Sequence, residues 1–84
     1  MIQLRYFASL REELGTDAEQ IELPEGVVDM AGLATHLKDR GGVWAAAFSS
    51  GRTLMMARNQ EAATPATGLS DGDEVAFFPP VTGG

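Results

Sequence analysis

Residues 74–80 read Glu-Val-Ala-Phe-Phe-Pro-Pro, an apolar run that two prolines bring to an end. Strand alternation places Val75 and Phe77 on one face of a sheet and Phe78 on the other. Proline has no N–H to donate, so strand pairing must stop where the prolines begin. We therefore expect the last strand to leave Phe78 outside the core, where its ring either anchors a partner or folds onto Trp44 or another neighbour.

The beginning of the chain supplies a second strand of the same kind. Ile2, Leu4 and Tyr6 alternate with polar residues over residues 2–8, and this period of two is typical of a half-buried strand. The first and last strands both carry many apolar residues. We therefore expect them to be parallel neighbours at the centre of one sheet, joined by a right-handed crossover.

The crossover contains the main helix. Asp29 is a good N-cap, and Lys38 and Arg40 lie in the expected last turn, where they favour the helix dipole. The pair Gly41-Gly42 ends the helix. Its apolar face is formed by residues at helical spacing, namely Met30, Leu33, Ala34 and Leu37.

The remaining segments are short. Ser9 is expected to cap one or two helical turns that Gly15 closes in a left-handed conformation. The other expected elements are a strand over 18–23, a short helix over 43–48, a strand over 52–58, a turn at Asn59-Gln60, a weakly patterned connection over 61–68 and a tight turn over 70–73.

This order of elements predicts an α+β domain of the β-grasp type. A mixed sheet of about five strands would pack on one main helix. We expect a single domain over residues 1–84, with a flexible tail over 79–84 that ends in Gly83-Gly84.

Composition narrows the functional classes. The chain has 84 residues and a net charge of −6, with 12 acidic and 6 basic residues. The basic residues are scattered from Arg5 to Arg58, which argues against nucleic acid and against an anionic membrane surface. A protein partner with a basic face is favoured, although an acidic surface also simply promotes solubility. Without a signal peptide or an apolar span, we expect a cytoplasmic protein.

Few side chains could carry catalysis. Cysteine is absent, and His36 is the only histidine, so neither a thiol nucleophile nor a metal site is expected. Ser49 and Ser50 have no base in view, and Met55 and Met56 are expected to fill gaps in the core. Two acidic clusters, one at Glu12-Glu13 and one at Asp71, Asp73 and Glu74, are expected to be solvated. The chain is expected to be a substrate or carrier for enzymes.

The tail fits a carrier. Residues 79–84 can project at most about 20 Å from the sheet, and the terminal Gly83-Gly84 has no Cβ that would block a narrow channel. A carboxylate presented in this way could attack the α-phosphate of ATP inside a partner and form a reactive acyl-adenylate. The alternative is a frayed terminus without function.

The segment Asp71–Gly84, DGDEVAFFPPVTGG, resembles the C-terminal signature of the sulfur-carrier subunits of molybdopterin synthase. The rest of the chain resembles the same family in order and length. The matching segments are Tyr6-Phe7-Ala8, Leu10-Arg11-Glu12, Leu14-Gly15 and the turn at Asn59-Gln60.

The resemblance implies a ubiquitin-like fold and a sulfur-transfer cycle. An activating enzyme of the ubiquitin-E1 type would adenylate Gly84 with Mg-ATP, and a sulfur donor protein would convert it to a thiocarboxylate. The chain itself would bind no cofactor. Its tail would enter the large synthase subunit, in a heterotetramer, and give sulfur to cyclic pyranopterin monophosphate. By matching position, Gly84 bears the sulfur; Gly83, Thr82 and Val81 thread the channel; and Phe78, Pro79 and Pro80 bind the partner.

Two features depart from the family pattern. Arg58 stands where an apolar strand residue is expected, and residues 61–68 are poor in apolar side chains. Three other functions remain open: a sulfur carrier for thiamine thiazole synthesis, a protein modifier joined to lysines through Gly84, and an inert interaction module.

Overall fold

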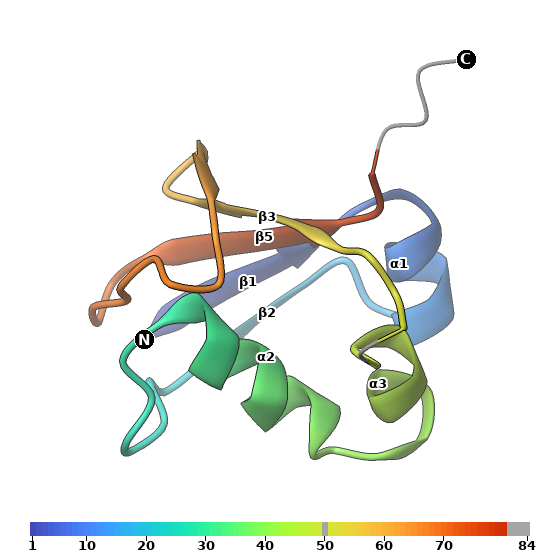
Figure 1. Cartoon of the computed structure of the whole chain (residues 1–84), viewed down its shortest axis with the longest axis horizontal. Coiled ribbons are helices and arrows are strands. Elements are labelled where there is room, and N and C mark those ends of the chain that lie inside the picture. Colours follow the sequence, from blue (N-terminus) through green and yellow to red (C-terminus); the bar gives the residue numbers. More distant parts are fainter. Residues whose placement is uncertain (50, 81–84) are drawn as a thin grey trace.

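A mixed five-stranded sheet with its helices gathered on one face makes up the fold (Figure 1). The computed structural model describes residues 1–49 and 51–80. In chain order the elements are β1 (Ile2–Tyr6), α1 (Ala8–Leu14), β2 (Ala18–Ile21), α2 (Met30–Lys38), α3 (Gly42–Ala47), β3 (Met55–Arg58), β4 (Glu61–Ala63) and β5 (Glu74–Phe78).

The two end strands lie side by side in the middle of the sheet. The strand order is β2-β1-β5-β3-β4, and β1 pairs with β5 in parallel, with Leu4 opposite Val75 and Tyr6 opposite Phe77. The other pairings, β1–β2, β3–β5 and β3–β4, are antiparallel. The predicted parallel pair at the centre is confirmed, and so is the β-grasp arrangement of a mixed sheet on one main helix.

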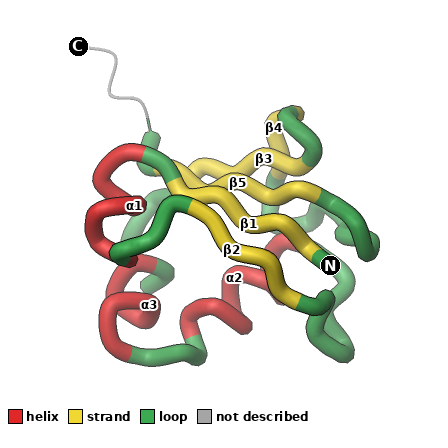
Figure 2. Tube along the Cα trace, turned by 180° about the vertical axis from the view of Figure 1, so that it is seen from behind, coloured by secondary structure: helices red, strands yellow, loops and turns green. Residues whose placement is uncertain are grey.

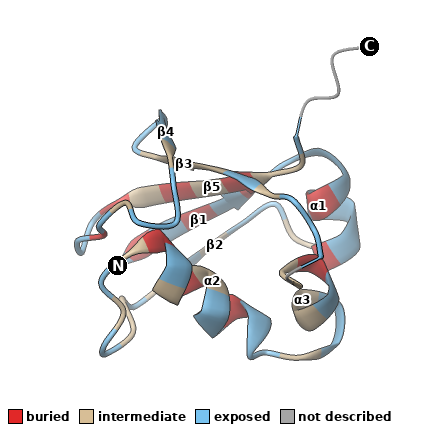
Figure 3. Cartoon of the chain, viewed as in Figure 1, coloured by how far each residue is buried: buried red, intermediate tan, exposed pale blue. Residues whose placement is uncertain are grey.

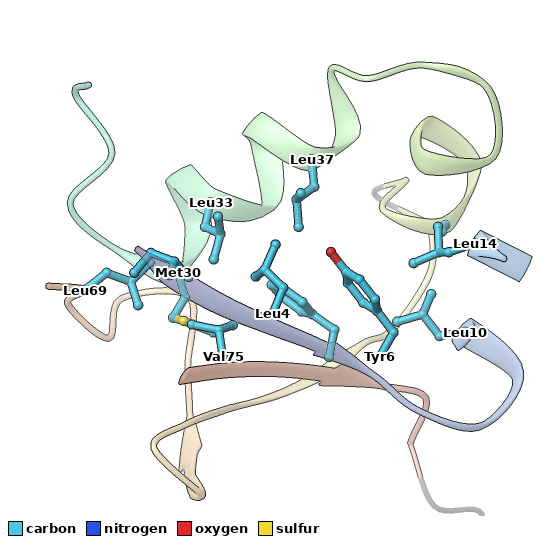
Figure 4. Packing of buried hydrophobic residues seen from close by; sticks show 12 residues of the cluster. Leu4, Tyr6, Leu10, Leu14, Met30, Leu33, Leu37, Leu69 and Val75 are labelled. Atoms are coloured by element: carbon cyan, nitrogen blue, oxygen red, sulfur yellow. The ribbon is translucent and has the colours of Figure 1, made fainter. Parts of the chain in front are cut away.

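The core fills the space between the sheet and α2. Alternate residues of β1 and β5 are buried, so each strand gives one face to the core, and Figure 3 shows this alternation. Figure 4 shows Leu33 and Leu37 pointing from α2 towards Leu4. The buried apolar residues are Ile2, Leu4, Tyr6, Leu10, Leu14, Met30, Leu33, Leu37, Ala47, Leu69, Val75 and Phe77.

A partly exposed polar cluster closes the core near α3. The hydroxyl of Tyr6 donates a 3.0 Å hydrogen bond to the carboxylate of Glu19, which Arg40 holds through two 2.9 Å contacts. The guanidinium of Arg40 lies 4.4 Å from the ring centroid of Trp44. Burial, followed by the charge of Glu19, raises the pKa of Tyr6 far above its ordinary value. The phenol is therefore a permanent donor that fixes this end of the sheet.

Two helix ends follow the predicted signals, and two do not. Asp29 caps α2, accepting a 2.9 Å bond from the Gly32 N–H, and Gly15 ends α1 with φ of 74°, as predicted. The expected cap at Ser9 is wrong. Phe7 occupies the N-cap position without a side-chain bond, and Ala8, at φ of 55°, turns the chain from β1 into the helix. α2 ends at Lys38 with Asp39 as its C-cap, so Arg40 does not lie in the last turn as expected, and Gly41-Gly42 lies beyond the end of the helix.

Several boundaries differ from those expected. β2 ends at Ile21, and β3 begins only at Met55. The segment expected to be a plain connection over 61–68 contains β4, which the predicted Asn59-Gln60 turn joins to β3. Met56 packs against the core, but Met55 is 45% exposed and does not fill a gap there, because the pleat turns it to the opposite face. None of the helices in the described ranges is long and apolar enough to span a membrane.

We expect Leu33→Ala to lower the free energy of unfolding by about 2–5 kcal/mol, because it leaves a cavity between α2 and the sheet. Val28→Ala removes an aliphatic side chain that is 69% exposed, and it should change stability by less than about 0.5 kcal/mol. Urea denaturation followed by circular dichroism measures both. Equal decreases in the free energy of unfolding for the two variants would contradict the packing described above.

Candidate functional site

Figure 2 shows α2 and α3 on one side of the sheet. An open groove lies on the opposite face. It has a volume of about 560 Å³. Residues from the three central strands and the adjoining segments line it, namely Arg5, Phe7, Ala8, Ala57, Gln60, Glu74, Ala76, Phe78 and Pro79. The surface that could meet a partner therefore includes the residues that lead into the C-terminal tail.

Small side chains form the floor of this groove. Ala76 of β5 lies opposite Ala57 of β3 and opposite Arg5 of β1. The same row continues to Ala62 on β4 and Ala18 on β2. One line across all five strands thus carries four alanines and one arginine. A floor of methyl groups lets the side chains of another protein approach the sheet closely.

Aromatic residues form one wall. Phe78 lines the groove and is half-buried, whereas its neighbour Phe77 is fully buried in the core, so the predicted outward position of Phe78 is confirmed. The alternative packing against Trp44 is wrong, because Trp44 lies on the helix face, where it contacts Tyr6 and Phe48.

Phe7 belongs to the same wall, although it was not among the predicted partner-binding residues. Its side chain is 43% exposed, and its N–H donates a 3.3 Å bond to the carbonyl of Phe77. Phe7 therefore continues the alternation of β1 by one residue, outward like Arg5. That alternation was the available signal, because it places odd-numbered residues of the first strand on the outer face.

Arg5 brings a cation into the groove. Its guanidinium lies 3.8 Å from the Glu74 carboxylate, and its side chain is 51% exposed. Arg40, Arg52 and Arg58, by contrast, hold carboxylates at 2.9 Å or less. Arg5 is thus only loosely paired, and it remains available to a carboxylate brought by a partner.

The acidic cluster over residues 71–74 was expected to be solvated, and this is wrong for one member. Asp73 is 7% exposed because its carboxylate accepts bonds from Arg58 Nε at 2.8 Å, Asn59 Nδ2 at 3.0 Å and the Ser70 N–H at 2.8 Å. Asp71 is exposed and pairs with the N-terminal amine. The same ion pair explains why an arginine, Arg58, stands where the family pattern has an apolar strand residue: Arg58 is the charge partner of Asp73.

The pKa of Asp73 reflects two opposing effects. Burial raises it, but the hydrogen bonds from Ser70, Arg58 and Asn59 stabilise the carboxylate and leave the pKa below its ordinary value. Asp73 is therefore ionised at neutral pH. It holds two turns together behind one end of the groove.

The tail begins at the groove. Pro79 lines it, and Pro80 is exposed immediately beyond. The predicted threading residues Val81, Thr82 and Gly83, and the predicted reactive Gly84, lie outside the described residues.

Two other candidates from the sequence, His36 and Glu13, lie at the surface of the described part of the chain. His36 is exposed on α2, and no group of three or more metal-ligating side chains is found within residues 1–49 and 51–80. Glu13 forms an exposed ion pair with Arg52 at the surface.

Comparisons with known proteins agree with this geometry. Residues 4–84 match the model of the ThiS family. The molybdopterin synthase sulfur carrier subunit of Escherichia coli is 43% identical over 84 residues, covering 100% of both chains. The chain belongs to the ThiS family, among the molybdopterin synthase sulfur carrier subunits. The family resemblance read from residues 71–84 is confirmed.

Solved structures related to this family share the fold. A putative molybdopterin converting factor subunit 1 from Pyrococcus furiosus has a TM-score of 0.75 and 31% identity, over 95% of this chain and 97% of that one. SAMP1 from Haloferax volcanii has a TM-score of 0.74 and 26% identity, over 99% and 98%. The predicted ubiquitin-like β-grasp fold is confirmed.

We expect Asp73→Asn to lower the free energy of unfolding at pH 7 by about 1–3 kcal/mol, because Arg58 loses its charged acceptor. A carboxylate with a lowered folded-state pKa contributes stability above its unfolded pKa of about 3.9 and loses it as the pH falls through the folded-state value. The difference between wild type and variant should therefore shrink below about pH 4. Urea midpoints measured between acid and neutral pH test this, and a constant difference would contradict it.

Proposed function

We propose that this chain is the sulfur-carrier subunit of a molybdopterin synthase and that its working atom is the C-terminal carboxyl of Gly84. The observation that carries the proposal is the full-length identity of 43% to a protein of that name. The Gly-Gly end of the sequence and the position of β5 support it. In this chain the last described residues, Pro79 and Pro80, continue directly from the central strand of the sheet.

The chemistry of the carrier follows from the carboxyl group. An E1-like activating enzyme would use Mg-ATP, and a carboxylate oxygen of Gly84 would attack the α-phosphorus with loss of pyrophosphate. Sulfide-level sulfur (HS⁻) released by a donor protein would then attack the acyl carbon, forming the C–S bond as the bond to AMP breaks and AMP leaves. The product is a thiocarboxylate on Gly84.

The large synthase subunit would use this thiocarboxylate. Sulfur passes from Gly84 to cyclic pyranopterin monophosphate, and water restores the carboxyl group. Each molybdopterin needs two sulfurs, so two carriers serve one product, which suits a heterotetramer of two small and two large subunits. The carrier chain supplies no catalytic side chain and binds no cofactor in this scheme.

The sequence of the tail suits its role, because two conformationally restricted prolines come first and two glycines without side chains come last. Pro79 and Pro80 favour an extended chain without a free N–H, and residues 79–84 reach at most about 20 Å. Gly83 and Gly84 have no Cβ, so Val81 and Thr82 are the bulkiest residues that would enter a channel. Rigid anchoring at β5 fixes where the tail starts.

The groove is the surface that we assign to the large subunit. Phe78 and Phe7 provide aromatic anchors, a residue type enriched at binding hot spots, and the alanine floor admits apolar side chains from the partner. Arg5 offers a loosely held cation for a partner carboxylate. Pro79 and Pro80 lie beside this surface, so docking would aim the tail at the partner's active site.

Deleting Gly84 should leave the fold intact and abolish sulfur transfer, because the reactive carboxyl would no longer reach the partner's catalytic groups. The measurement is intact-mass analysis after incubation with the activating enzyme, ATP and a sulfide source. Wild type should gain the mass difference between sulfur and oxygen at its terminus, and the truncated chain should not. A truncated chain that still supported molybdopterin formation would refute the assignment of Gly84.

Phe78→Ala should weaken binding to the large subunit by about 10-fold or more, because it removes a half-buried aromatic anchor, and it should affect the melting temperature less. Titration calorimetry and thermal unfolding separate the two effects. Val43→Ala is a matched control, since Val43 is 52% exposed on α3, on the other side of the sheet. A large fall in melting temperature with unchanged affinity would place the role of Phe78 in folding.

A protein modifier is the second candidate. It is favoured by the likeness to SAMP1, whose fold superposes with a TM-score of 0.74. Conjugation through Gly84 would give a ladder of larger species on reducing immunoblots of cell extracts. A single small band would contradict the modifier and leave the sulfur carrier as the remaining candidate.

A further inference from the structure

The turn between β3 and β4 has a backbone conformation that is uncommon for residues other than glycine. Asn59 and Gln60 have φ of 50° and 69°, the left-handed region that a hairpin turn of this length requires at both positions. Asparagine tolerates it, but glutamine does so less readily. Such a conformation persists only where the surroundings over-determine it.

The surroundings here are a set of bonds that we call the Asp73 clasp, formed by Arg58, Asn59, Ser70, Asp73 and Glu74. The Asp73 carboxylate accepts from Arg58 at 2.8 Å and from Asn59 at 3.0 Å. The Asn59 side chain accepts a 2.9 Å bond from the Glu74 N–H, and the Asn59 N–H donates a 2.8 Å bond to the Glu74 carbonyl. Ser70 closes the clasp through its N–H at 2.8 Å.

The clasp and the groove share neighbours along the chain. Gln60 follows Asn59 and lines the groove, and Glu74 follows Asp73 and lines it too. Arg58 follows Ala57, whose methyl group is part of the floor, and the pleat turns Arg58 to the other face. The clasp thus holds the polar end of the groove from behind the sheet.

We infer that Asp73 is a positioning residue that keeps the β3–β4 turn, and with it the Gln60 wall of the groove, in the conformation that binds the large subunit. The inference rests on the function proposed above, and it adds a buried residue that does not itself line the groove. Loss of the clasp would leave the core intact, since none of its members belongs to the apolar core. The partner would then have to order the turn on binding, at the cost of affinity.

The first test uses the free protein. In Asp73→Asn, the amides of Asn59 and Glu74 keep their own acceptors, so any change in their exchange reports looser surroundings. We expect their hydrogen exchange to accelerate by about 10-fold or more, while amides of β1 keep their protection. Unchanged exchange at both positions would overturn the inference, because the turn would then be held without Asp73.

The second test is affinity for the large subunit by titration calorimetry at pH 7. Asp73→Asn and Asn59→Gly should each weaken binding by about 10-fold. Asn59→Gly is informative because glycine accepts the positive φ and removes only the side-chain bonds. Both variants are compared below their melting temperatures, so a destabilised but folded variant still gives a valid result.

Glu13→Gln is the matched control, since it removes a carboxylate that pairs with an arginine away from the groove. It should change neither the affinity nor the exchange at Asn59. Faster exchange with unchanged affinity in both clasp variants would show a purely structural role and overturn the inference. If wild type itself failed to bind the large subunit, the proposed function would fall, and the exchange data would still decide whether Asp73 holds the turn.

Discussion

The parallel pairing of β1 with β5 is the constraint on which the other features depend. It joins the first strand of the chain to the last, and β2 and β3 lie on opposite sides of this pair. The chain must therefore cross the sheet between β2 and β3, and α2 makes this crossing on the face where Leu4 and Val75 need cover. The crossover leaves the opposite face uncovered by α2 and α3. A groove beside the start of the tail is therefore a consequence of the topology as well as of the residues in it.

The same pairing fixes where the tail begins. β5 has a neighbour on each side, so its backbone is held along its length until the prolines end the ladder. In the function proposed above, this fixed origin matters because the partner would have to find the terminal carboxyl after it meets the body of the carrier. The aromatic wall at Phe7 and Phe78 lies at that origin.

The sequence predicted the parts of the structure that repeat a regular signal. Alternation located β1 and β5, and the Asp29 cap located α2. The family resemblance of residues 71–84 pointed to the function. The errors arose where long-range contacts override local pattern. Asp73 looked like one more surface carboxylate because Arg58 and Asn59, its partners, are 15 and 14 residues away. Phe7 was missed for a different reason: a large aromatic side chain at an outward position departs from the apolar-in, polar-out pattern of β1.

Electrostatics act at two ranges in this molecule. A net charge of −6 favours encounter with a basic partner, yet the groove itself carries the loosely paired Arg5. The negative net charge and the positive charge in the groove are compatible. Long-range attraction depends on total charge, whereas the fit inside a groove depends on individual contacts at a few ångströms. A basic partner that presents one carboxylate among apolar side chains satisfies both conditions. A uniformly basic surface would be attracted by the net charge but would offer no carboxylate to Arg5, and an acidic surface would offer the carboxylate but be repelled. The groove would therefore discriminate against partners that the net charge alone would attract.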